Sequence, residues 1–161
     1  MLDAVRSTFP HFTFHIDCNS GYTLRDADLF KRVDRYRLAM IEQPLQAGDL
    51  VDHAELQKMI ETPVCLDESI RSLHDAQVAL RIGSCRIVNI KMGRVGGLGV
   101  AKAIHDLCAA HGVPCWVGGM LESALGQAFS IALASLPGMA YPSDIFPSAR
   151  FYAQDLSEPE I

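Results

Sequence analysis

Three acidic residues, Asp17, Glu42 and Asp67, each come directly after a short apolar run and are spaced 25 residues apart. If the fold brought them together, the three carboxylates would repel one another strongly unless a cation lay between them. Oxygen ligands without histidine or cysteine favour Mg²⁺ or Mn²⁺ over zinc. The pattern therefore predicts a magnesium or manganese site. The alternative is that each carboxylate caps the next helix or pairs with a surface lysine.

Lys91 continues this series 24 residues after Asp67, again at the end of an apolar run. Beside a metal ion the ammonium form of a lysine is disfavoured, so the side chain can act as a base. We therefore expect Lys91 to transfer a proton. The alternative is that it only balances the charge of the carboxylates. The turn after the next apolar run contains Gly118, Gly119 and Met120, and its glycines would let the backbone approach a bound substrate.

The other polar motifs favour no competing chemistry. The loop 93–99 resembles a phosphate-binding turn at a helix N-terminus, but it lacks the G-x-G-x-x-G spacing of dinucleotide sites. We interpret it as a tight turn from strand to helix. The six histidines do not show the H-E-x-x-H spacing of zinc sites, and the sequence has no G-x-S-x-G nucleophile motif.

Alternating strands and helices must position these residues. The short apolar runs are typical of buried parallel strands, and the segments between them carry apolar residues at spacings of three and four. Asp49 and Ser72 are expected N-caps, and Gly83 and Gly112 are expected at helix C-termini. The expected strands are 12–16, 38–41, 64–66, 87–90 and 113–117, and the expected helices are 24–33, 50–60, 73–82 and 100–110.

This order predicts an α/β fold with a parallel sheet and right-handed crossovers. A doubly wound sheet would also satisfy it, but one polar residue at the end of each successive strand favours a (β/α) barrel with its site on that face. We count five strands and a weak sixth at 139–145, whereas a closed barrel has eight. The sequence therefore predicts a partial TIM-like barrel of about five or six βα units. Strands are expected to be missing ahead of residue 12 and after residue 150.

Composition excludes several other classes. The 161 residues are 49% hydrophobic and 20% charged, as in an ordinary globular protein. A net charge of −5 without a Lys/Arg run argues against a nucleic-acid surface. The five cysteines lack a C-x-x-C pair, which indicates reduced thiols and a cytoplasmic protein. We read neither a signal peptide nor a membrane span and expect no membrane partner.

Five short motifs, taken in order, resemble the enolase superfamily, and most closely the o-succinylbenzoate synthase / N-acylamino acid racemase family of the muconate lactonizing subgroup. They are Asp17-x-Asn19, Ile41-Glu42-Gln43-Pro44, Leu66-Asp67-Glu68-Ser69, Asn89-Ile90-Lys91 and Gly118-Gly119-Met120-Leu121-Glu122-Ser123. The resemblance implies that Asp17, Glu42 and Asp67 bind Mg²⁺, which in turn binds the carboxylate of a small-molecule substrate. It implies that Lys91 exchanges the α-proton or stabilises an enediolate, and that Asn19 and Glu68 support the metal ligands.

Two parts of the family pattern are not found in the sequence. The family carries a Lys-x-Lys motif on an earlier strand and an N-terminal capping domain, so we interpret residues 1–161 as the C-terminal part of the barrel. We expect this part to be inactive alone, and to form a homo-oligomer or require a missing N-terminal segment. The alternatives are a dipeptide epimerase, a muconate-type cycloisomerase, or a non-catalytic metal-binding or assembly fragment.

Overall fold

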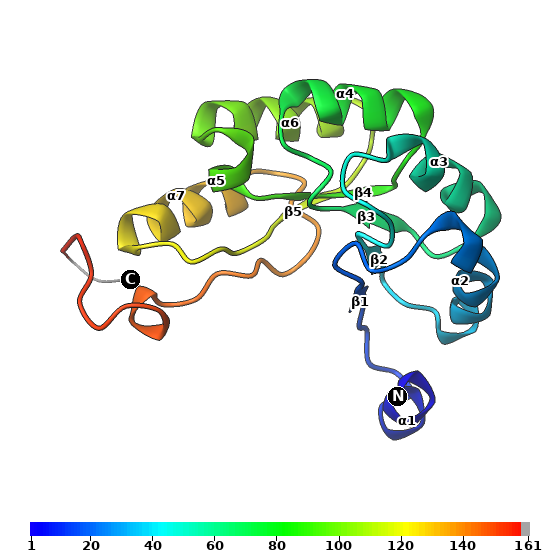
Figure 1. Ribbon diagram of the computed structural model, residues 1–161. Coiled ribbons are helices and arrows are strands. Elements are labelled where there is room, and N and C mark those ends of the chain that lie inside the picture. Colours follow the sequence, from blue (N-terminus) through cyan, green and yellow to red (C-terminus); the bar gives the residue numbers. More distant parts are fainter. Residues whose placement is uncertain (159–161) are drawn as a thin grey trace. The chain divides into compact units, whose positions relative to one another are not determined.

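A computed structural model describes residues 1–158 (Figure 1). The chain divides into two compact units, whose boundaries fall after Ser69, inside helix α4 (Leu73–Ile82) and inside strand β4 (Ile87–Ile90). The first unit comprises residues 1–69 and 78–87, and the second comprises 70–77 and the chain from 88 onward. Both units combine parallel strands with helices, which confirms the expected α/β class.

The first unit contains three short parallel strands with their Cα partners in register. Ile16 pairs with Ile41, which pairs with Val64, while Asp17 pairs with Glu42. The elements of this unit are α1 (Leu2–Thr8), β1 (Ile16–Asp17), η1 (Leu24–Asp26), α2 (Ala27–Val33), η2 (Asp34–Tyr36), β2 (Ile41–Glu42), α3 (Leu50–Met59) and β3 (Val64–Leu66). Strands β2 and β3 are fully buried, so their apolar residues form part of the core of this unit.

The ladder between β1 and β2 ends at a proline. In a longer parallel ladder the backbone N–H of residue 44 would donate to the carbonyl of Cys18, but Pro44 has no N–H. The Cys18 carbonyl accepts instead from the N–H of Gly21, at 2.9 Å. The chain therefore leaves the sheet directly after Asp17 and Glu42, and both carboxylates lie at the carboxyl ends of their strands.

The second unit contains two parallel strands and the helices that follow them. Val88 pairs with Cys115, and Ile90 pairs with Val117. The complete elements of this unit are α5 (Met92–Val95), α6 (Leu98–Ala110), β5 (Cys115–Val117), α7 (Ala124–Ala134) and η3 (Ser148–Arg150). The expected weak strand at 139–145 runs beside β5 through one bridge, Cys115 to Met139, and through a bond from Asp144 N to Val117 O at 2.9 Å. It does not form a regular strand.

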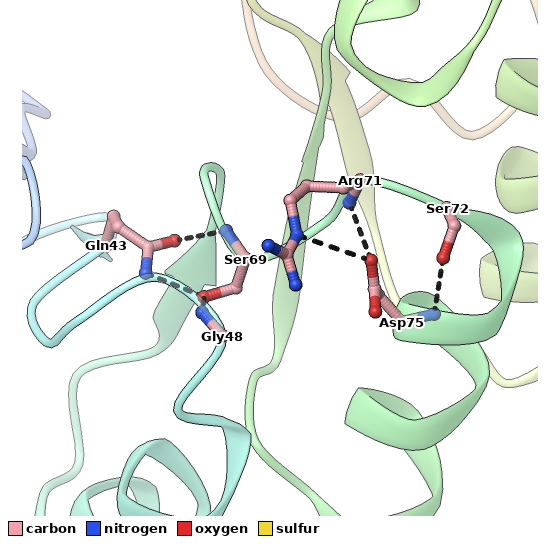
Figure 2. Close-up of polar contacts among 6 residues, drawn as sticks. All are labelled: Gln43, Gly48, Ser69, Arg71, Ser72 and Asp75. Carbon is pink, nitrogen blue, oxygen red and sulfur yellow. Dashed lines mark hydrogen bonds and ion pairs between the residues drawn. The ribbon is translucent and has the colours of Figure 1, made fainter.

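Most expected elements are confirmed. Strands β3 and β4 and helix α4 have the expected bounds. The side chains of Asp49 and Ser72 each accept a backbone N–H in the first turn of their helices, and Figure 2 shows the bond to Ser72. Gly83 and Gly112 have φ angles of 75° and 66°, as expected of residues that end helices.

The expected strand at 12–16 is wrong except for its last residue. Phe12 is 66% exposed. Arg6 of α1 donates to the Phe12 carbonyl at 2.8 Å, and its guanidinium lies 4.5 Å from the centre of the Phe14 ring. These contacts bind the segment to α1, so the strand begins only at Ile16. Helices α1, α5 and α7 were not expected, and α7 contains Gly126 in its first turn.

All five cysteines are free thiols, and four of them are buried. Within residues 1–158, no helix combines the length and the apolar character needed to cross a bilayer.

Candidate functional site

The first unit places the three predicted metal ligands at neighbouring strand ends. Asp17 and Glu42 are Cα partners in the ladder, and Glu42 is also the partner of Cys65. Side chains alternate between the faces of a strand, so Asp67, two positions after Cys65, continues on the same face. The register therefore directs all three carboxylates to one face at the carboxyl end of the strands.

The environment of Asp17 is polar and negatively charged. Asp17 is exposed, and one of its carboxylate oxygens accepts the backbone N–H of Asn19 at 2.9 Å. Asn19 has a φ of 47°, so the chain turns sharply here and contacts Asp17 through its backbone. The pKa of the Cys18 thiol is raised to about 12, first by burial and then by the negative charges of Asp17 and Glu42. The thiol is therefore neutral, and the local field favours a cation.

Glu42 and Asp67 are buried, whereas Glu68 is half-buried. Glu42 is 3% exposed and Asp67 is 2% exposed. A carboxylate of Glu42 lies 3.5 Å from Nε2 of His15, whose side chain is 42% exposed. His15 stands two positions before Asp17 and directly ahead of β1. His15 could not be assigned to this site from the sequence, since its contact with Glu42 depends on the register of β1 against β2.

The donor chemistry of the three carboxylates fits a hard divalent cation. Burying ionised carboxylates is costly without a counter-charge, and the site supplies oxygen donors rather than thiolates. Within the described residues, however, no three histidine, cysteine, aspartate or glutamate side chains lie close enough together to hold a metal ion. The fold therefore aligns the predicted ligands by register without closing them around a common point, and the metal site stays a prediction.

In the second unit, Lys91 is packed against Gly118. Lys91 is half-buried and lies between β4 and α5. A Cβ atom on residue 118 would lie 2.6 Å from Cε of Lys91 and would overlap the side-chain amide of Asn89. Glycine at position 118 therefore leaves room for the stem of Lys91, in addition to the substrate role that we expect of it.

Gly119 and Met120 have different environments. A Cβ atom on Gly119 would overlap the backbone carbonyl of Asp144, so this glycine allows the 139–145 segment to approach β5. Met120 is 43% exposed, and its N–H donates to the Glu122 carboxylate at 2.8 Å. The close approach of Asp144 gives Gly119 a packing role within the chain itself. Substrate contacts of Gly118, Gly119 and Met120 stay predictions.

One residue with a central place in the site carries no charge. Gln43, directly after Glu42, is fully buried, and its side-chain oxygen accepts the backbone N–H groups of Asp67 and Ser69. In the sequence, Gln43 stands out only as part of the motif Ile41-Glu42-Gln43-Pro44. No local pattern in the sequence indicates this role, because it depends on a backbone φ of 35° and on bonds to residues 24 and 26 positions away.

Parallel α/β units whose strands end in functional side chains define the class of barrel proteins with a site at the carboxyl ends of the strands. The Enolase C-terminal domain-like family matches residues 1–161 of the chain. The chain belongs to this family, which confirms the resemblance found in the sequence.

Two relatives illustrate the similarity. The chain is 55% identical over 157 residues to the o-succinylbenzoate synthase of Geobacillus stearothermophilus, and 50% identical over 159 residues to the N-succinylamino acid racemase of an Amycolatopsis species. Both alignments cover 98% of this chain. The chain spans only 42% of the length of the synthase and 43% of the racemase.

Solved structures support the same assignment. A member of the enolase superfamily from Enterococcus faecalis V583 superimposes with a TM-score of 0.92 at 44% identity, covering 99% of this chain and 43% of that protein. A dipeptide epimerase from the same organism, complexed with Mg and the dipeptide L-Leu-L-Tyr, superimposes with a TM-score of 0.82 at 25% identity, covering 89% of this chain and 42% of that protein. The similarity to these proteins confirms the partial (β/α) barrel fold.

Proposed function

We propose that this chain supplies the metal site and one proton-transfer group of an enzyme that abstracts the α-proton of a carboxylate substrate. The proposed reactions are those of o-succinylbenzoate synthase and N-succinylamino acid racemase, because relatives with these names are 55% and 50% identical. Since the chain spans 42% of the synthase, the activity is proposed for a protein of that full length.

The observation that carries the proposal is the register of the strand ends. Asp17 and Glu42 are Cα partners, and Asp67 follows the Cα partner of Glu42 by two positions on the same face. In the proposal these three side chains hold a magnesium ion, the metal present in the related dipeptide epimerase. When bound, the ion would supply Lewis-acid stabilisation to the negative charge that develops on the substrate carboxylate.

Lys91 is proposed to hold and move the substrate proton at its Nζ atom. Its Cε and the side-chain amide of Asn89 both lie in the space beside Gly118, which limits the directions in which the amine can reach. A proton α to a carboxylate is a very weak acid, so the base must be well placed as well as uncharged. Asn19, through its backbone bond to Asp17, is proposed to orient that carboxylate, and Glu68 is proposed to support the neighbouring Asp67.

The test uses a chimaera in which this chain replaces the matched 157 residues of the Geobacillus stearothermophilus synthase. Exchange of the α-proton of an N-succinylamino acid with D₂O is followed by NMR, and synthase turnover is measured on the same sample. Lys91→Ala should lower exchange by about 10²–10⁴-fold. Lys102→Ala is the control, because Lys102 is an exposed lysine of α6 that pairs with Asp106. An active chimaera whose Lys91→Ala variant exchanges at the parent rate would refute the proposed role.

A dipeptide substrate separates the proposal from its nearest alternative. The related epimerase of known structure acts on dipeptides by its name, but it is 25% identical to this chain. The chimaera should therefore exchange the α-proton of an N-succinylamino acid faster than that of a dipeptide. The opposite order would favour dipeptide epimerisation.

A further inference from the structure

Gln43 reverses the direction of its backbone at the end of β2. It is fully buried and has a φ of 35°, in the left-handed region that non-glycine residues rarely adopt. Its carbonyl accepts the N–H of Ser20 at 2.9 Å and so faces the chain after β1. The Gln43 carbonyl therefore does not take part in the ladder with β3. One backbone N–H directly after β3 is left without its regular acceptor.

The side chain of Gln43 takes that acceptor position. The N–H of Gln43 donates to Cys65 O at 2.8 Å, so in a regular parallel ladder the N–H of Asp67 would next donate to the Gln43 carbonyl. It donates instead to Oε1 of Gln43, at 3.0 Å. The same oxygen accepts the N–H of Ser69 at 3.1 Å, as Figure 2 shows.

The amide group of Gln43 is fully hydrogen-bonded. Its Nε2 donates to the Leu45 carbonyl at 3.0 Å and to Oγ of Ser69 at 2.8 Å. Ser69 Oγ also accepts the N–H of Gly48 at 3.3 Å, so the loop after β2 is tied to the chain after β3 (Figure 2). With two bonds donated and two accepted, the side chain has no freedom to rotate without leaving a buried polar group unsatisfied.

We propose that Gln43 is a positioning residue that sets the place of the Asp67 carboxylate relative to Glu42, and thereby the affinity of the metal site. The inference rests on the proposed function, which makes Asp67 and Glu42 ligands. Gln43 acts through the backbone N–H of Asp67 rather than by touching the ion. Its own backbone directly continues that of Glu42, so a single buried residue connects two of the three carboxylates.

The test compares Gln43→Leu with Gln57→Leu, measured by Mn²⁺ titration of the full chain. Gln57 is a matched control because it is also buried and its Oε1 accepts an N–H of β3, from Val64 at 2.7 Å. Val64 is the first residue of that strand, whereas Asp67 follows its last. Gln43→Leu removes the acceptor of two buried N–H groups and Gln57→Leu removes that of one, so both should lower the melting temperature. Only Gln43→Leu should weaken Mn²⁺ binding, by about 10–100-fold.

Amide hydrogen exchange at Asp67 and Ser69 gives a second measurement that needs no metal. Exchange at both should accelerate in Gln43→Leu and stay slow in Gln57→Leu. If the leucine variant does not fold, Gln43→Glu replaces it, because a glutamate keeps the accepting oxygen and should retain slow exchange at Asp67.

The outcomes separate the two levels of the hypothesis. A parent chain that does not bind Mn²⁺ would contradict the proposed function, and with it any role of Gln43 in metal affinity. A parent chain that binds, together with equal Mn²⁺ affinities in the two leucine variants, would overturn the role of Gln43 alone. Fast exchange at Asp67 in Gln43→Glu would also count against that role.

Discussion

The stem of Lys91 occupies the space that a side chain at Gly118 would need. The ideal Cβ position at residue 118 is 2.6 Å from Cε of Lys91, and the side-chain amide of Asn89 lies against the same position. Real Cβ atoms do not approach other heavy atoms so closely. The conformation of Lys91 therefore depends on the absence of a side chain one strand away, at the carboxyl end of β5.

Gly118→Ala should consequently impair proton transfer while leaving the fold intact. The added methyl group must displace the end of Lys91 or the Asn89 amide, and a displacement of about 1 Å can cost 10²-fold in rate. We expect α-proton exchange by the chimaera to fall by about 10–100-fold. Gly99→Ala is the matched control, because a Cβ there meets nothing within 4 Å. Equal exchange rates in the two variants would show that the Lys91 position tolerates the methyl group.

His53 makes the stability of the first unit depend on pH. It is fully buried in α3, where one ring nitrogen lies 2.6 Å from the Asp49 carbonyl and the other accepts the N–H of Leu45 at 3.2 Å. Burial lowers the pKa of His53 below its ordinary value of 6.5. The unfolded chain therefore takes up this proton first as the pH falls, and stability should decline below about pH 6.5.

Chemical denaturation between pH 7.5 and 5.5 measures this dependence. His53→Gln should be less stable than the parent at pH 7.5 but should lose less stability on acidification, since glutamine does not titrate. His11→Gln, at an exposed position, controls for the loss of an imidazole. A His53→Gln variant with the same pH slope as the parent would exclude His53 as the cause.

Asp155 caps α7 from a segment distant in the sequence. Its carboxylate accepts the N–H of Ala124 at 2.8 Å and the N–H groups of Leu156 and Ser157. The nearby Ser148 hydroxyl and then these backbone groups lower the pKa of Asp155 to about 2, from an ordinary value of 3.8. The stabilisation is therefore fully present above pH 3.8 and is lost as the pH falls toward 2.

An NMR titration of the Asp155 carboxyl tests this contact directly. The apparent pKa should be near 2, and Asp155→Asn should speed amide exchange at Ala124, because an amide binds the helix N-terminus less strongly than a carboxylate does. An ordinary carboxyl titration, with unchanged exchange in the variant, would show that Asp155 does not hold this helix end.

The sequence predicted the fold best where local signals and tertiary packing agree. Strand β3 and helix α4 have the expected bounds because their apolar patterns, caps and terminating glycine all indicate the same residues. The strand expected at 12–14 does not form, because an apolar run indicates that a segment tends to be buried but not what the segment packs against. Phe12 and Phe14 contact Arg6 of α1, and the Phe14 carbonyl makes one backbone bond, from the N–H of Ala39 at 3.0 Å.

Of the candidate site, the sequence pattern reveals the charged residues. The acidic residues and Lys91 stand at strand ends, so a regular spacing reveals them. The role of Gln43 could not be predicted, because it depends on a backbone φ of 35° and on bonds to residues 24 and 26 positions away. The requirement for glycine at position 118 likewise depends on where Lys91 lies, which no local pattern encodes.

The central claim is that Asp17, Glu42 and Asp67 form one divalent metal site, and isothermal titration of the full chain with Mn²⁺ tests it most directly. The parent should bind Mn²⁺, and Asp17→Asn, Glu42→Gln and Asp67→Asn should each weaken binding at least about tenfold, because each removes a charged oxygen ligand. Asp28→Asn, which alters an exposed carboxylate paired with Lys31, should bind as the parent does. Absence of binding by the parent, or undiminished binding in all three ligand variants, would contradict the account.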